Sequence, residues 1–194
     1  MSPAPRAWPE SPEVYGYLSL DERGQWLIRG EPISRTSLVE HLQRHYQCDD
    51  GGRWFVKNGW QQAFVTLAYL PWVLRVTGAG ELINHCQRPV ASIKGAAIDE
   101  YGALALLTDA GPGLVDSRDL DWALARLAAG DRPVADDDLD DALKVTSGAL
   151  TALSFRTPCG TLLPVHRVDR DDMAAHFGFV PDPRPTPKAR ETLQ

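Results

Sequence analysis

The histidine and cysteine side chains are the first candidates for chemistry in this sequence. His41 and His45 are four residues apart in a predicted helix, and Cys48 follows three residues later. This spacing puts two imidazole rings on one helix face, an arrangement that can hold zinc. A complete site needs further ligands, and only His85 and Cys86 form a compact second group. We therefore predict no metal site and no cofactor.

Cys159 and His166 are the candidates for nucleophilic catalysis. Cys159 lies in a predicted hairpin loop, residues 157–161, and His166 follows it by seven residues. A thiol activated by a nearby imidazole can attack acyl groups, so the pair indicates a hydrolase as one alternative. The sequence contains no nucleophile elbow, phosphate loop or dinucleotide-binding motif. The catalytic residues are therefore left unknown.

A connection between a predicted strand and a predicted helix carries the candidate ligand-binding residues. Arg35 lies where the free N–H groups and partial positive charge of a helix start favour an anion. Alternatively, Arg35 pairs with Glu31 or Glu40 and only orients the loop. Trp60, beside a predicted turn, could line a pocket or an interface. The predicted set for a small anionic ligand or a protein partner is Gly30, Pro32, Ile33, Arg35, Trp60 and Trp72.

The charge distribution argues against two classes of partner. Net charge is −6 over 194 residues, and the excess of acidic residues lies after residue 97. An acidic surface repels phosphate backbones, so we predict no binding of nucleic acid. No segment is apolar over the ~20 residues that span a bilayer, so we predict no membrane association. Three scattered cysteines and an N-terminus without an apolar run favour the cytoplasm.

Short β-rich segments alternate with helical patterns along the chain. The first helix is predicted to begin at Ser37, with Glu40 completing a capping box. Further helices are predicted at 118–129, 136–144 and 170–177, and residues 111–113 are predicted to form a loop. The three strands at 53–57, 61–68 and 72–77 are expected to form an antiparallel meander after the first helix.

Two Asp-Glu-x-Gly turns organise the fold prediction. Residues 18–28 can be laid over residues 96–106 at an offset of 78 positions, with a strand, a turn and a strand in the same order. We predict an α+β fold of two related small β-hairpin and helix modules, with mostly antiparallel sheets packed together. The predicted divisions are a disordered lead-in (1–13), an N-terminal module (14–78), a C-terminal module (79–180) and a proline-rich tail (181–194).

The segment from Trp26 to Val39 resembles a known signature. Its pattern, W-x-x-x-G-x-P-I-x-R-x-x-L-V, is similar to the opening of DUF1285, a bacterial family of unknown function. The resemblance extends loosely over residues 15–77. It implies an α+β fold with repeated motifs and a role in signalling or regulation.

Three classes of function follow from these observations. The leading hypothesis is a non-enzymatic module that binds a small anionic ligand or a protein partner and acts in regulation or signalling. The first alternative is a homo-oligomeric assembly or scaffold protein, for example a homodimer formed through sheet edges or exposed aromatic residues. The second alternative is a hydrolase that uses Cys159 and His166, or a metal held by His41 and His45.

Overall fold

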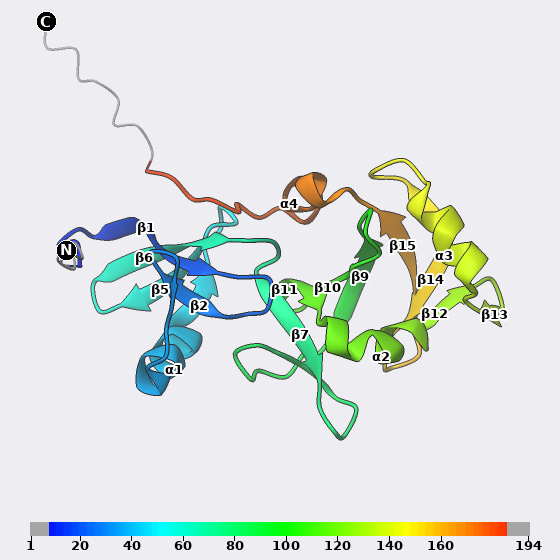
Figure 1. Cartoon of the computed structure of the whole chain (residues 1–194), viewed down its shortest axis with the longest axis horizontal. Helices are drawn as coiled ribbons and strands as arrows, with labels where there is room; N and C mark the ends of the chain where they lie inside the picture. Colours follow the sequence, from blue (N-terminus) through cyan, green and yellow to red (C-terminus); the bar gives the residue numbers. More distant parts are fainter. Residues whose placement is uncertain (1–7, 186–194) are drawn as a thin grey trace, which may run out of the picture.

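The computed structural model describes residues 8–185, whose strands form two sheets that pack together (Figure 1). The first sheet has six strands in the order β3-β2-β1-β6-β5-β4. These strands are β1 (Glu13–Leu20), β2 (Trp26–Ile28), β3 (Glu31–Pro32), β4 (Tyr46–Cys48), β5 (Trp54–Asn58) and β6 (Gln61–Leu67). The predicted α+β class with two packed sheets is confirmed.

The second sheet has nine strands and curls on itself (Figure 1), in the order β13-β12-β14-β15-β9-β10-β11-β7-β8. They are β7 (Trp72–Val76), β8 (Leu82–Asn84), β9 (Ile93–Ile98), β10 (Leu104–Thr108), β11 (Gly111–Val115), β12 (Leu127–Ala129), β13 (Arg132–Pro133), β14 (Leu150–Arg156) and β15 (Leu162–Arg167).

The helices are short. They are α1 (Thr36–His45), α2 (Leu120–Leu124), α3 (Asp136–Leu143) and α4 (Met173–Phe177), and one-turn 3-10 helices precede α2 and α4. Leu42 of α1 is buried against the first sheet. The predicted capping by Ser37 is wrong: Arg35 takes the N-cap position with an extended backbone, and Ser37 lies within the first turn. No helix in the described part of the chain is long and apolar enough to cross a bilayer.

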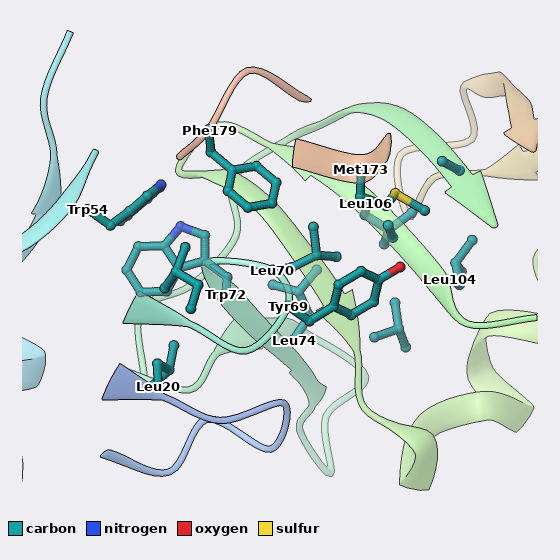
Figure 2. Close-up of a cluster of buried hydrophobic side chains, with 14 of the residues drawn as sticks. Leu20, Trp54, Tyr69, Leu70, Trp72, Leu74, Leu104, Leu106, Met173 and Phe179 are labelled. Carbon is teal, nitrogen blue, oxygen red and sulfur yellow. The ribbon is translucent and has the colours of Figure 1, made fainter. Parts of the chain in front are cut away.

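The buried core is continuous across both sheets. Trp54 of β5 meets Trp72 of β7 edge to face, with ring centroids 5.1 Å apart. Figure 2 shows these rings beside Phe179, which comes from the segment after α4. Trp26, Trp54 and Trp72 are at most 3% exposed, as expected for core-forming tryptophans, whereas Trp60 is 67% exposed. Edge-to-face contacts of this kind add about 0.5–1.5 kcal/mol per pair beyond burial.

The two sheets share a pattern of strand connections. In the first sheet, β1 pairs antiparallel with β2 and parallel with β6, which pairs antiparallel with β5. In the second sheet, β9 has the same relations with β10 and β15, and β15 pairs antiparallel with β14. The registers also correspond, because Leu20 lies opposite Trp26 and Ile98 lies opposite Leu104.

The predicted antiparallel meander is confirmed for β5 and β6, which pair antiparallel, and is wrong for its third strand, β7. Strand β6 runs parallel to β1, and β7 pairs with β11 and β8 of the second sheet. The change of sheet falls between Leu67 and Trp72, where Pro71 has no N–H group to donate to a strand ladder. The division of the chain at residue 78 into two domains stays a prediction.

Two further element assignments differ from the sequence prediction. The helix predicted at 118–129 ends at Leu124, and Leu127 pairs with Phe155 in the sheet. Residues 111–113 form part of β11 rather than a loop. Gly113 belongs there because a Cβ atom at this position would lie 2.7 Å from Leu74 Cγ. Glycine lets the two strands approach closely.

The segment after α4 returns to the first sheet (Figure 1). Val180 N–H donates to Gly52 O at 2.8 Å, and Leu67 N–H donates to Pro181 O at 2.7 Å. Pro181, the first residue of the predicted tail, is thus hydrogen-bonded to the end of β6. The rest of the tail, 186–194, and the lead-in residues 1–7 lie outside the described residues.

Candidate functional site

Two turns of one type end β1 and β9. The Asp21 carboxylate accepts hydrogen bonds from two backbone N–H groups of its own turn, and the Asp99 carboxylate does the same. Gly24 and Gly102 close the turns at φ +80°, a conformation that glycine adopts without strain. Each turn therefore places its two middle residues at the end of a central strand. These are Glu22 and Arg23 after β1, and Glu100 and Tyr101 after β9.

Arg170 joins the two turns. Its guanidinium donates to Glu22, and its backbone N–H donates to Glu100 Oε2 at 2.8 Å. The guanidinium carbon lies 3.9 Å from the ring centroid of Tyr69, whose hydroxyl donates to buried Asp99 at 2.9 Å. Burial, followed by the charge of Asp99, raises the pKa of Tyr69, so this phenol keeps its proton. Arg170 is therefore held in a fixed orientation.

A second arginine is fixed beside this group. Arg118 Nε and Nη2 donate to the two oxygens of Asp116 at 2.9 and 2.8 Å. Arg75 Nε lies 3.6 Å from the same carboxylate. The side-chain hydrogen bonds from Arg118 lower the pKa of Asp116 to about 2, so the carboxylate stays ionised at neutral pH. The charge of Asp116 is thus balanced by its arginine partners.

These groups line an open cavity of about 670 Å³, which we call the arginine cavity. Its lining includes Arg23, Arg118, Arg170, Glu22, Asp116 and the ring of Tyr101. Arg118 and Arg170 each pair with one of the acids, whereas Arg23 forms no ion pair among the described residues. Tyr101 is 78% exposed. The cavity can therefore offer one uncompensated guanidinium and one open aromatic face.

Comparisons with known proteins place the chain in a family. The family model DUF2944, described as "Protein of unknown function (DUF2946)", matches residues 2–184. The chain belongs to this family. No functionally curated protein matches the DUF2944 chain significantly.

Two crystal structures resemble the DUF2944 chain. A DUF1285 family protein from Silicibacter pomeroyi is 14% identical, with a TM-score of 0.53 over 79% of this chain and 81% of that one. A DUF1285 family protein from Shewanella baltica is 11% identical, with a TM-score of 0.41 over 54% of this chain and 87% of that one. The first likeness shows a shared fold, in line with the resemblance found in the sequence. The signature at residues 26–39 remains untested.

The residues predicted to bind a ligand do not meet in the arginine cavity of the DUF2944 chain. Gly30, Pro32 and Arg35 are exposed and Ile33 is half-buried. Arg35 Nε donates only to Ser37 Oγ, at 3.1 Å, and forms no ion pair among the described residues, so the predicted pairing with Glu31 or Glu40 is absent there.

The two tryptophans predicted to bind a ligand differ in their exposure to solvent. Trp72 is 2% exposed, and its Nε1 donates to Ala110 O at 2.8 Å. A side chain enclosed in this way cannot contact a ligand at the surface, so its assignment to the site is corrected. Trp60 is exposed at the turn between β5 and β6.

Cys159 and His166 do not form a dyad. Cys159 lies in the turn before β15, and His166 lies near the end of that strand, where it neighbours His176 with ring centroids 5.2 Å apart. The five strand residues from Leu162 to His166 are separated by four steps, which alone span about 13 Å. Hydrogen bonds from the hydroxyls of Thr157 and Thr161 lower the pKa of Cys159 to about 7, but within the described part of the chain no imidazole is hydrogen-bonded to its thiol.

His41 and His45 are adjacent, with ring centroids 4.6 Å apart. Within residues 8–185, no three histidine, cysteine or acidic side chains gather as they would around a metal ion.

Sequence reasoning missed Arg23, Tyr101, Arg118 and Arg170. The repeated Asp-Glu turns marked the places of Arg23 and Tyr101. No sequence signal marked Arg118 or Arg170, because both reach the cavity through tertiary contacts.

Proposed function

We propose that this DUF2944 protein is a non-enzymatic module that binds a small anionic ligand in the arginine cavity. The observation that carries the proposal is the meeting of Arg23, Arg118 and Arg170, from three separate segments, around one cavity. Planar guanidinium groups bind phosphate or carboxylate groups through paired hydrogen bonds. The exposed ring of Tyr101 adds a surface on which a flat ring can stack.

The acids that line the cavity limit the charge of the ligand. Asp116 is committed to Arg118, but Glu22 is half exposed and can separate from Arg170 when an anion arrives. A ligand with one phosphate or carboxylate group therefore suits the site better than a highly charged one. A role in regulation or signalling in the cytoplasm is part of this proposal, since ligand binding without turnover is the action of a sensor.

The proposal is tested by titration calorimetry with adenosine monophosphate, inorganic pyrophosphate and uncharged adenosine as probes. The wild-type chain is expected to bind adenosine monophosphate, and Arg23→Gln should weaken this binding at least tenfold, a loss of about 1.4 kcal/mol. Arg156→Gln is the matched control, because Arg156 is exposed on β14 and does not line the cavity.

Arg35→Gln tests the site predicted from the sequence in the same experiment. Equal binding by Arg35→Gln and the wild type supports the arginine cavity. Loss of binding in Arg35→Gln but not in Arg23→Gln, or no binding of either anion at millimolar concentration, contradicts the proposal.

The alternative of a homo-oligomer has limited support from the sheet edges. The edge strands β3, β4, β8 and β13 have only two or three residues each. Short edges offer few free hydrogen-bonding groups to a second copy. A homodimer would therefore have to use exposed aromatic residues such as Trp60 and Tyr101.

We also propose that the two sheets arose by internal duplication. The support is the shared arrangement of β2-β1-β6-β5 and β10-β9-β15-β14, with corresponding registers at the two Asp-Glu turns. An alignment of many family sequences tests this idea. The idea would be contradicted if, across the family, residues 18–28 failed to align with residues 96–106.

A further inference from the structure

A second cavity lies between α1 and the first sheet, separate from the arginine cavity. Its volume is about 160 Å³, and nearly all of its lining is apolar. Leu38 and Leu42 of α1 form one wall, and Val56 and Ala63 of the sheet form the opposite wall. An apolar cavity of about 150 Å³ stays dry and admits a molecule the size of benzene. The size and lining of this cavity therefore suit one small ring.

His41 supplies a polar group in this lining. Its Nε2 atom is shielded from solvent and has no hydrogen-bond partner among the described residues. A buried polar atom without a partner is unfavourable, so a ligand that completes its hydrogen bond gains affinity. Because a neutral imidazole nitrogen either donates or accepts, a hydroxyl group matches both tautomers.

The N-terminal strap, residues 8–11, covers one side of the cavity. Trp8 lines the cavity, and its Nε1 donates to Gln61 Oε1 at 2.8 Å. Gln61 Nε2 donates in return to Pro9 O at 2.8 Å and to Ser11 O at 2.7 Å. Gln61 is 7% exposed, so these bonds are shielded from water. The Gln61 side chain thus ties the strap to β6 through three hydrogen bonds.

We propose that this cavity is a binding site for a small phenol or similar ring alcohol. The ring occupies the apolar space, the hydroxyl group meets His41 Nε2, and the N-terminal strap closes over the ligand. The site is independent of the arginine cavity, and neither proposal requires the other.

The test uses 4-fluorophenol and fluorobenzene as probes. Fluorine NMR measures the binding of each probe to the full chain. The wild type is expected to bind 4-fluorophenol at least tenfold more tightly than fluorobenzene. His41→Phe should remove this preference while fluorobenzene still binds. His166→Phe is the matched control, since His166 lies on β15 and does not line the cavity, and it should keep the wild-type preference.

Two further variants test the space and the strap. Ala63→Leu fills the cavity and should abolish binding of both probes in a chain whose circular dichroism shows that it is folded. Trp8→Ala removes the strap's side of the cavity but keeps the walls that α1 and the sheet form, and it should speed the exchange of 4-fluorophenol at least several-fold, seen as a change in line width. Arg23→Gln should change neither affinity.

Three outcomes overturn the proposal: no binding of either probe to the wild type at millimolar concentration, equal affinity of the wild type for the two probes, or undiminished binding in folded Ala63→Leu. Unchanged exchange in Trp8→Ala overturns the role of the strap.

Discussion

The imidazole of His85 lies among the rings of Trp26, Tyr46 and Trp72 and is 8% exposed. Its Nδ1 accepts a hydrogen bond from Val73 N–H at 3.2 Å, which fixes the neutral form. Burial, with a smaller contribution from the charge of Arg88, lowers the pKa of His85 to about 3. The ring cannot gain a proton without disrupting this aromatic cluster.

Acid should therefore destabilise the protein through His85. The folded-state pKa lies below the unfolded value of about 6.5, so protons bind preferentially to the unfolded chain as the pH falls below 6.5. The stability that His85 provides is complete above that pH and is lost progressively toward pH 3. Between pH 7 and pH 5 the free energy of unfolding should fall by about 2 kcal/mol from this residue.

Urea unfolding at pH 7 and pH 5 measures this loss. His85→Gln keeps a hydrogen-bond acceptor but cannot titrate, so its stability should fall by clearly less between the two values of pH. Equal losses in the variant and the wild type would show that His85 does not control the acid response.

At the scale of elements, β11 shows how close packing selects glycine. Gly111 faces Trp54, which lies 3.0 Å from the place of a Cβ atom, and Gly113 faces Leu74 at 2.7 Å. Leu74 is fully buried in the neighbouring strand. Gly111 leaves room for Trp54 of the first sheet, and Gly113 leaves room for Leu74 of the neighbouring strand β7.

Gly113→Ala should reduce the free energy of unfolding by about 1–3 kcal/mol, because the added methyl group overpacks the core. Gly95→Ala is the matched control on β9, where the nearest side-chain atom, Leu107 Cβ, lies at an ordinary 3.4 Å. That change should stay within about 0.5 kcal/mol. Guanidinium unfolding of both variants measures the difference, and similar losses would contradict the close approach at β11.

At the scale of the whole molecule, the segment after α4 ties the end of the described chain to the first sheet. Gly52 has φ +75°, and a Cβ atom there would lie 2.5 Å from Gly178 O. Gly102 has φ +80° in a turn of the same type, but nothing lies within 4 Å of its Cβ position. Comparing substitutions at Gly52 and Gly102 therefore distinguishes two contributions to the free energy of unfolding. One is the strain of the left-handed backbone, and the other is the displacement of the segment after α4.

In both Gly52→Ala and Gly102→Ala, the free energy of unfolding should fall by about 1–2 kcal/mol, because alanine is strained in the left-handed conformation. Gly52→Ala should lose at least about 1 kcal/mol more, since the returning backbone must shift. Thermal unfolding measures both variants, and limited proteolysis should cut Gly52→Ala sooner after α4. Equal stabilities would show that the contact with Gly178 adds little.

Local sequence determined the turns, most strands and the type of fold. An Asp side chain that accepts two backbone N–H groups, and a Gly that adopts positive φ, act within five residues, so Asp21–Gly24 and Asp99–Gly102 were readable as turns. Acidic residues at a helix start likewise marked α3 at Asp136.

Only the tertiary structure decided which strands pair and which residues share a site. Strand β6 pairs with β1 in parallel, and β7 belongs to the second sheet. These pairings bury Trp54 against Trp72, a contact between distant strands that no local pattern encodes. Arg170 meets Glu22 across 148 residues of sequence. Arg35 sits at a helix start as predicted, yet what lies around such a start depends on distant segments, and there the fold leaves it exposed.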